Sequence, residues 1–451
     1  MKRVFSIIVS LLCLLTISCS EPPRKQVLKI YNWADYIDES VLEDFKVWYK
    51  EQTGEDIEIV YQLFDINEIM LSKIEKGKED FDVVCPSEYI IERMLRNNML
   101  IPLEMEKHLP DSINYTKHLS PYIKNRFSMI DGSGKNANDY AVGYMWGTTG
   151  ILYNTNYVTE EEASTWEVLH NTKFKKKIFI KDAFRDVYST ALIYLRQKEL
   201  DEAKARGEVN PDAKLNLDSL MYDSSDKSIA DVEAFLKKAK PLVAGWEADF
   251  GKEMMTKEKA YINLSWSGDA SWAIEQAAEV GVSLDYCVPK EGSNVWFDGW
   301  VIPKYAKNTK AARYFISYMC RPDIAIRNMN ETGYVSAVAS PEVLEEMSDT
   351  TLVATVDASY FFGEIGKEAK LDPVLYPDKE VVERCAMMHD SGDRTPKLLD
   401  MWSRVKSNDV PIWNYTIIII SFVVLLFLAI RRKIQKSHKA SHRATNKKKQ
   451  R

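Results

Sequence analysis

Aromatic side chains stand close to carboxylates at several points of this sequence, each time next to a predicted β-strand. The examples are Trp33 with Asp35 and Tyr36, Ser87-Glu88-Tyr89, Arg185-Asp186, Trp266 with Asp269, and Trp296 with Asp298. A carboxylate forms a charge-assisted hydrogen bond with an organic ammonium group, and an indole face attracts the same cation while covering methylene groups. The pattern predicts a site for an organic cation; a ligand with an ammonium group at each end would need such a pair twice.

Each of these pairs also has a purely structural interpretation. Asp35 and Asp269 could cap the helices that follow them. Arg185 and Asp186 could simply begin a solvated helix. Five such groups at strand ends nevertheless favour one shared site, because the carboxyl ends of the strands in an open α/β sheet lie along one edge.

Strands and helices alternate along the chain. In a first series, strands are predicted at 27–32, 57–62 and 82–85, and helices at 40–52, 66–76 and 88–96. A second series has strands at 150–154, 177–180, 260–266 and 285–288, and helices at 185–198, 229–240 and 269–279. This alternation predicts an α/β fold with parallel sheets and helices on both faces. The charged stretch 199–227 is expected to be a surface insert without a role in the site.

Familiar catalytic and cofactor motifs are absent from the sequence. It contains no GxxxxGK[ST] phosphate loop, no HExxH or GxSxG, and no paired cysteines with zinc spacing. We therefore expect no cofactor, no metal and no catalytic residues. Two acids acting as a glycoside-cleaving pair stay open at this stage, because carboxylates are abundant.

The net charge of −6 conceals an uneven distribution. Residues 431–451 hold ten Lys and Arg and no acid, and Lys2 and Arg3 stand at the other end, so the remainder carries 48 basic against 66 acidic residues. An acidic body argues against a nucleic-acid partner and suits a cationic ligand.

Both ends of the chain carry membrane-directed signals. Residues 1–18 combine Lys2 and Arg3 with an apolar run, and Cys19 follows, which predicts a lipoprotein signal peptide with lipidation at Cys19. Residues 410–430 contain no charge and are long enough for a transmembrane helix. The basic stretch 431–451 then predicts a cytoplasmic tail, with the acidic body outside.

The remaining cysteines lie far apart. Cys85, Cys287, Cys320 and Cys385 have apolar neighbours and no CxxC spacing. Free buried thiols are the simpler interpretation, and one disulfide of unknown pairing stays open.

Several of these runs, taken in order, match a known family. They are Tyr31-Asn-Trp33 with Tyr36, Phe81-Asp-Val-Val-Cys-Pro-Ser87, Tyr144-Met-Trp-Gly-Thr-Thr-Gly150, Trp266-Ser-Gly-Asp269, Val288-Pro-Lys-Glu-Gly292, Arg321-Pro-Asp323 and Glu331-Thr-Gly-Tyr334. From about residue 27 to about residue 406 the sequence resembles the bacterial spermidine/putrescine-binding proteins, the extracellular receptors of ABC-type polyamine importers.

The resemblance implies a two-lobed periplasmic-binding-protein fold with crossover hinge strands. It places lobe 1 at 27–149 with 297–345, and lobe 2 at 150–296 with 346–406. It further implies a set of ligand-binding residues, with aromatic walls, three ammonium-binding carboxylates and one polar contact. They are Trp33, Tyr36, Tyr89, Trp266, Trp296 and Tyr334, then Asp186, Asp269 and Asp298, and finally Ser87.

Some positions depart from the family pattern. Ala34 replaces a hydroxyl residue, Ala183 stands where spermidine-type members carry a further carboxylate, and Met388 replaces a polar contact. Asp269 resembles the acid of putrescine-type members, whereas Trp296 is the spermidine-type residue. These features favour a diamine and leave the choice between putrescine and spermidine open.

We therefore expect a receptor without catalytic activity, tethered on the periplasmic side of the inner membrane, that delivers polyamines to an ABC permease. The tether would use the Cys19 lipid and the C-terminal helix. Two alternatives are a polyamine sensor that signals through its membrane helix, and an envelope hydrolase that uses two of the cleft acids.

Overall fold

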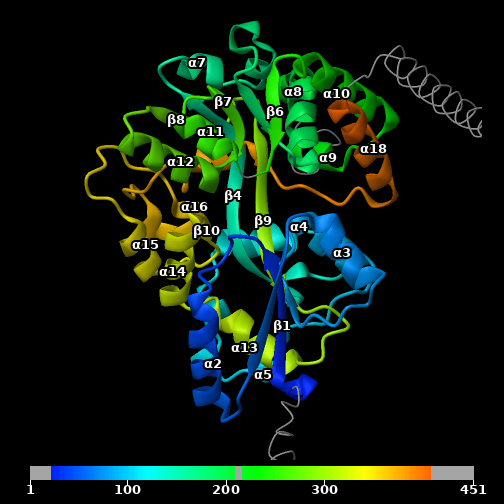
Figure 1. The fold of residues 1–451 in the computed structure, drawn as a ribbon, viewed down its shortest axis with the longest axis vertical. Coiled ribbons are helices and arrows are strands. Elements are labelled where there is room, and N and C mark those ends of the chain that lie inside the picture. Colours follow the sequence, from blue (N-terminus) through cyan, green and yellow to red (C-terminus); the bar gives the residue numbers. More distant parts are fainter. Residues whose placement is uncertain (1–21, 209–215, 249, 408–451) are drawn as a thin grey trace, which may run out of the picture. The chain divides into compact units, whose positions relative to one another are not determined.

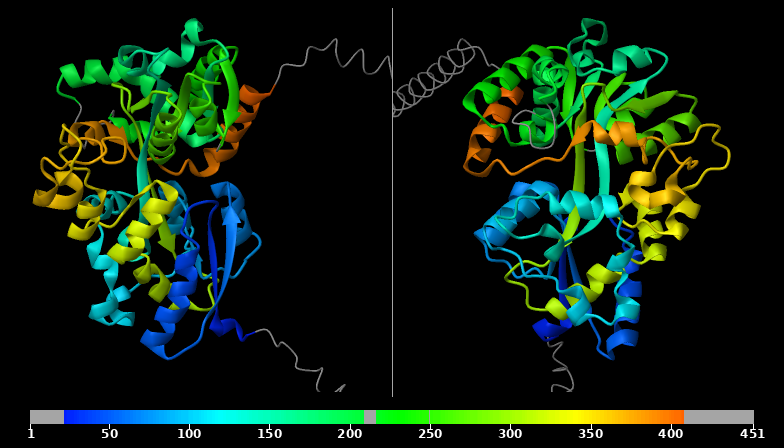
Figure 2. Two further views of the ribbon diagram at one scale, coloured as in Figure 1. Left: turned by 60° about the vertical axis from the view of Figure 1, so that its left-hand side comes forward. Right: turned by 180° about the vertical axis from the view of Figure 1, so that it is seen from behind.

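The computed structural model describes residues 22–208, 216–248 and 250–407. Two long strands, β4 (Ala141–Asn154) and β9 (Ser293–Val301), run antiparallel to each other and are buried along their whole length. The sheet order is β2-β1-β3-β9-β4-β7-β5-β6. The central pair therefore connects two groups of strands, which form the two lobes of the fold, and Figures 1 and 2 show it extending from one lobe into the other.

The first lobe is built on β1 (Val27–Trp33), which pairs in parallel with β2 (Glu58–Phe64) and β3 (Val83–Val84). Its helices are α2 (Ser40–Thr53), α3 (Asn67–Glu75), α4 (Glu88–Arg96), α5 (Met105–His108), α6 (Pro121–Ser128), α13 (Thr309–Tyr318) and α14 (Pro322–Thr332). Helix α2 buries Val41, Leu42 and Phe45 on one face and ends at Gly54, whose φ of 73° is a left-handed conformation that glycine adopts without strain.

The second lobe is built on β5 (Ile178–Lys181), which pairs in parallel with β6 (Val243–Glu247) and β7 (Ile262–Trp266). Strand β8 (Leu284–Cys287) pairs with β4. The helices of this lobe are α7 (Glu160–Ala163), α8 (Phe184–Ala205), α9 (Leu217–Tyr222), α10 (Asp226–Ala239), α11 (Gly251–Thr256) and α12 (Ser267–Glu279). Helices α8 and α12 follow β5 and β7 directly, so both begin at the carboxyl end of a strand.

Two sequence expectations need correction. The sheet is mixed rather than parallel, because β4 and β9 run antiparallel to each other and to their neighbours β7 and β3. Strand β4 also begins nine residues before the predicted start at Gly150. The stretch 199–227 is not only a surface insert, since α8 continues to Ala205 and α9 buries Leu220 and Met221.

The segment after α14 contains short elements. They are β10 (Val335–Ser336), α15 (Pro341–Met347), α16 (Ser359–Phe362), α17 (Lys379–Glu383), β11 (Cys385–Ala386) and α18 (Thr395–Lys406). Ser120 donates a hydrogen bond to the Phe361 carbonyl oxygen at 2.8 Å, and the rings of Phe361 and Trp146 stack at 5.4 Å. This part of 346–406 thus packs against helix α6 and strand β4, and the assignment of the whole segment to lobe 2 stays a prediction.

The predicted membrane attachments lie outside the described residues. This holds for the signal 1–18, for Cys19, for the helix 410–430 and for the tail 431–451. Among the described helices, none combines the length and apolarity needed to cross a membrane. Cys85, Cys287, Cys320 and Cys385 are free thiols, so the disulfide that stayed open is not formed between them.

Candidate ligand-binding site

Asp298 lies in the middle of β9, on the same strand face as Asn294 and Trp296, because side chains alternate along a strand. It is only 6% exposed. The Ser87 hydroxyl donates a hydrogen bond to Asp298 Oδ1 at 2.6 Å, and the Tyr36 hydroxyl donates to Oδ2 at 2.9 Å. Ser87 precedes the first residue of α4, and Tyr36 follows β1. Residues far apart in the sequence thus hold one carboxylate in place.

Asp186 lies in the first turn of α8 and is equally buried. Its Oδ1 accepts hydrogen bonds from Thr149 Oγ1 at 3.0 Å, Trp266 Nε1 at 3.0 Å and Asn294 Nδ2 at 3.1 Å. All three donors are neutral. The carboxylate is oriented by strands β4, β7 and β9 together without being neutralised.

Glu88, the acid of the Ser87-Glu88-Tyr89 group noted in the sequence but absent from the set that the resemblance implies, adds a third acid to this group. It is fully buried, and its Oε2 accepts a hydrogen bond from the Phe297 backbone N–H at 2.9 Å. Two buried acceptor atoms, Glu88 Oε1 and Asn294 Oδ1, have no hydrogen-bond partner among the described residues. We call Asp298, Asp186, Glu88 and Asn294 the Asp298 cluster.

Burial in the Asp298 cluster disfavours the ionised form of its three acids. Burial raises the pKa of Asp298 to about 6, an effect that the nearby Asp186 charge reinforces and that the Ser87 and Tyr36 hydrogen bonds oppose. Burial also raises the pKa of Asp186 and raises that of Glu88 well above its usual range. Among the described residues, the partners of Asp298 and Asp186 are hydroxyl, indole and amide groups rather than lysine, arginine or histidine. Such an arrangement would suit a cationic ligand.

Aromatic rings surround this region. The Tyr334 ring meets the rings of Tyr36 and Trp296 at 5.4 Å and 5.5 Å, both edge to face. Tyr334 also lies against Gly268, where a Cβ would be 2.4 Å from Tyr334 Cδ1, so only glycine permits this approach. The structure thus brings Tyr334 together with Tyr36, Trp296 and the start of α12.

Two predicted aromatic residues have other neighbours. The half-buried Trp33 packs against Phe64 at 4.5 Å, and Arg185 covers the ring of Tyr89 at 5.1 Å. The Tyr89 hydroxyl accepts a hydrogen bond from Asn67, which also donates to Ser87. Contact of Trp33 and Tyr89 with a ligand stays a prediction.

Asp269, in the first turn of α12, has cationic partners within the protein. Its Oδ2 lies 2.6 Å from Lys181 Nζ, and its Oδ1 lies 3.0 Å from the Tyr334 hydroxyl and 3.4 Å from Lys252 Nζ. Burial raises the pKa of Asp269, but the charges of Lys181 and Lys252 outweigh that effect and leave the pKa below its usual value. Its role as an ammonium-binding carboxylate stays a prediction.

The predicted set of ligand-binding residues leaves out Lys181, Asn294 and Glu88, although Glu88 is the acid of the Ser87-Glu88-Tyr89 group. Asn294 could have been found, because its spacing from Trp296 and Asp298 places all three on one strand face. Glu88 has a local signal, its place beside Tyr89 after a predicted strand, whereas no local signal distinguishes Lys181 from an ordinary surface charge. The burial of both residues arises only when distant segments pack.

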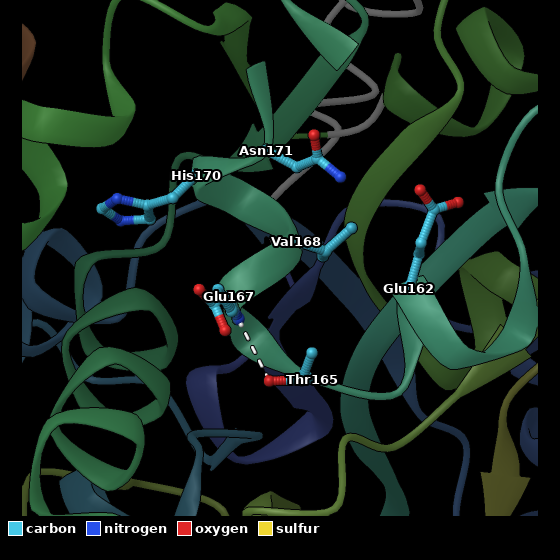
Figure 3. A pocket seen from close by; sticks show the side chains of 6 residues that line it. All are labelled: Glu162, Thr165, Glu167, Val168, His170 and Asn171. Atoms are coloured by element: carbon cyan, nitrogen blue, oxygen red, sulfur yellow. Dashed lines mark hydrogen bonds between the residues drawn. The ribbon is translucent and has the colours of Figure 1, made fainter. Parts of the chain in front are cut away.

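A separate surface hollow lies beside α7. It is lined by Glu162, Thr165, Glu167, Val168, His170 and Asn171 (Figure 3). None of these six residues belongs to the predicted site, and the hydrogen bond that the Glu167 N–H donates to Thr165 Oγ1 is a local helix-start contact. The hollow adds nothing to the Asp298 cluster.

Comparison with known proteins identifies the family of this chain. The family model described as bacterial extracellular solute-binding protein matches residues 45–355. The chain is 25% identical over 394 residues to a spermidine/putrescine-binding periplasmic protein of Salmonella typhimurium, covering 87% of this chain and 95% of the relative. It is 28% identical over 340 residues to the putrescine-binding periplasmic protein PotF of Escherichia coli, covering 72% and 82%.

A solved structure is also similar. The spermidine/putrescine ABC transporter substrate-binding protein PotD of Streptococcus pneumoniae superposes with a TM-score of 0.60 at 29% identity, covering 84% of this chain and 98% of that one. This chain therefore belongs to the bacterial extracellular solute-binding proteins. The predicted two-lobed fold and the resemblance to spermidine/putrescine-binding proteins are confirmed.

The raised pKa of Asp298 predicts a pH-dependent stability. The folded-state pKa of about 6 exceeds the unfolded value of about 3.9, so the stability that this group contributes is present below pH 4 and lost as the pH rises through 6. In ligand-free protein, Asp298→Asn should raise the melting temperature by a few degrees at pH 8 and by much less at pH 4.5.

Thermal unfolding followed by circular dichroism at the two pH values measures this difference. Asp139→Asn, at an exposed acid in a short 3₁₀ turn, serves as the control and should leave the melting temperature unchanged at both. A variant that is less stable than the wild type at pH 8 would contradict the assignment of a disfavoured buried charge.

Proposed function

We propose that this protein captures polyamines, putrescine or spermidine, outside the cytoplasm and delivers them to an ABC permease without catalysing a reaction. The observation that carries the proposal is the pair of buried carboxylates, Asp298 and Asp186, which neutral donors orient and no described cation balances. A buried charge is unfavourable unless it is paired, so the cluster gains most from an ammonium group with several N–H donors.

The surroundings of the Asp298 cluster suit the rest of such a ligand. The edge-to-face contacts among Tyr36, Trp296 and Tyr334 form an aromatic wall that can cover methylene groups and attract the cation. The unpartnered oxygens of Glu88 and Asn294 can accept further N–H groups. The names of the similar proteins, which specify spermidine and putrescine, support the same ligand class.

In this proposal, closure of the two lobes on the bound polyamine links its capture to its delivery to the permease. Asp298 is held by Ser87 and Tyr36 of the first lobe, whereas Asp186 lies in the first turn of helix α8 of the second lobe. A ligand whose ammonium groups contact both carboxylates interacts with the closed arrangement more strongly than with an open one, and therefore favours closure. We propose that the permease recognises the closed form.

The membrane tether is proposed from the sequence alone. A lipid on Cys19 and a helix at 410–430 would hold the receptor beside its permease on the periplasmic face of the inner membrane. Fractionation of cells that express the tagged protein tests this tether. Recovery of the protein in the soluble fraction would contradict it.

Asp298→Asn should weaken putrescine binding at least tenfold, because the substitution removes the negative partner of a buried ammonium group. Isothermal titration calorimetry with putrescine and with spermidine measures the change, and Asp139→Asn should bind like the wild type. Unchanged affinity for both polyamines in the Asp298 variant would falsify this assignment.

Polyamine affinity should also fall in acid. An ammonium group needs the ionised carboxylate, and a pKa of about 6 leaves roughly a tenth of Asp298 ionised at pH 5. The dissociation constant for putrescine should therefore rise about tenfold between pH 7 and pH 5 at constant ionic strength. Titration calorimetry at both values tests this; an affinity independent of pH would show that Asp298 is not the titrating partner.

A further inference from the structure

A short segment that leads into α18 lies between the two lobes. It consists of His389, Asp390 and Ser391. On the side of the second lobe, Arg185 of α8 donates hydrogen bonds to the His389 carbonyl oxygen and to the Ser391 hydroxyl group. The His389 ring also stacks on Tyr222, the last residue of α9, with the ring centroids 3.8 Å apart. Two helices of the second lobe therefore hold this segment.

The same segment contacts helix α4 of the first lobe. His389 Nδ1 lies 2.9 Å from Glu92 Oε2, and the Asp390 backbone N–H donates a hydrogen bond to the same oxygen at 3.2 Å. The Asp390 carboxylate oxygens lie 3.9 Å from Arg93 Nη1 and 3.8 Å from Arg96 Nη1. Figures 1 and 2 show the segment, drawn in orange, between α4 and the second lobe. We call Glu92, Arg96, His389 and Asp390 the cross-lobe latch.

The central pair of the cross-lobe latch is buried. Glu92 is fully buried and His389 is only 4% exposed. The other carboxylate oxygen of Glu92, Oε1, lies 2.6 Å from Arg96 Nη2 of the same helix. A buried carboxylate is strongly destabilised when one of its partners is removed. Because the partners of Glu92 come from both lobes, this network forms only while α4 and the segment 389–391 are in contact.

Helix α4 connects the cross-lobe latch to the ligand site. Ser87, directly before α4, donates its hydrogen bond to Asp298. Tyr89 and Glu92 are three residues apart and lie on one face of the helix. On this face, the Arg185 guanidinium lies 5.1 Å from the centroid of the Tyr89 ring. A movement that separates the lobes would therefore break the latch and open the ligand site together.

We propose that Glu92 and His389 are positioning residues, which stabilise the closed arrangement of the lobes through this latch without contacting the ligand. A contact that forms only in the closed arrangement raises the fraction of closed protein, and a ligand that binds the closed form then binds more tightly. Residues outside the Asp298 cluster thus set part of the polyamine affinity. This inference rests on the proposed function, because it assumes that a polyamine binds between the lobes.

His389→Phe tests the latch. The phenyl ring can keep the stack on Tyr222 but lacks the nitrogen that contacts Glu92. Titration calorimetry on the full-length protein in detergent should show a dissociation constant for putrescine that is about fivefold higher or more. Wild-type affinity in the folded variant would overturn the inference and leave the proposed function standing. A wild-type protein that binds no polyamine would remove both.

His108→Phe is the matched control. His108 Nε2 lies 3.4 Å from Glu104 Oε2, and both side chains are exposed. This histidine–glutamate pair lies within α5 and the residue before it, so it connects groups of the first lobe only. The dissociation constant of the control should equal that of the wild type.

A double-mutant cycle with Glu92→Met separates the latch from two independent effects. If both residues act on affinity through one contact, the variant that carries Glu92→Met and His389→Phe should bind putrescine no more than twofold more weakly than the weaker single variant. Fold-losses that multiply in the double variant would show that the two residues act independently, which would overturn the inference.

The binding rates provide a readout that a merely structural role would not change. Because the latch forms after the lobes close, its loss should speed putrescine dissociation about fivefold and leave the association rate within twofold. Stopped-flow tryptophan fluorescence on the wild type and His389→Phe measures both rates. Slower association with unchanged dissociation would contradict the inference. If His389→Phe did not fold, as judged by circular dichroism, the same measurements on Glu92→Gln would decide, and wild-type affinity and rates would overturn the inference.

Discussion

A buried carboxylate with only neutral partners among the described residues is the constraint on which the rest of this structure depends. Asp298 and Asp186 are both only 6% exposed, and the groups that hold them are hydroxyls, an indole N–H and an amide. Such an arrangement costs folding free energy, because burial disfavours the ionised form. Proteins keep unfavourable buried charge mainly where it serves binding or chemistry. We propose that a ligand cation would complete this hydrogen-bonded network.

The second lobe resolves the same problem differently. Asp269 is as buried as Asp298, yet Lys181 and Lys252 supply positive charge and its pKa moves down instead of up. Two acids that look alike in sequence, each a few residues after a tryptophan, therefore have opposite electrostatic roles. Asp298 is the proposed partner of a ligand cation, and Asp269 joins β5, α12 and Tyr334 through contacts within the chain.

Much of the fold follows from local sequence patterns. Helix α4 begins and ends where its periodicity predicts, and β1 and α2 differ from their predicted bounds by one residue. The carboxyl ends of β5 and β7 also place Asp186 and Asp269 at helix starts, as expected. The antiparallel pairing of β4 with β9 was not predictable, because a fully buried strand shows no alternation of polar and apolar residues and its direction depends on distant partners. The ion pair of Lys181 with Asp269 joins residues 88 positions apart in the sequence, and the residues next to either one do not predict it.

A crystal structure of the soluble body in complex with putrescine tests the central claim most directly. The account predicts ligand nitrogens within hydrogen-bonding distance of Asp298 and Asp186, with the methylene groups beside Trp296 and Tyr334. A ligand whose nitrogens contact neither carboxylate would contradict it.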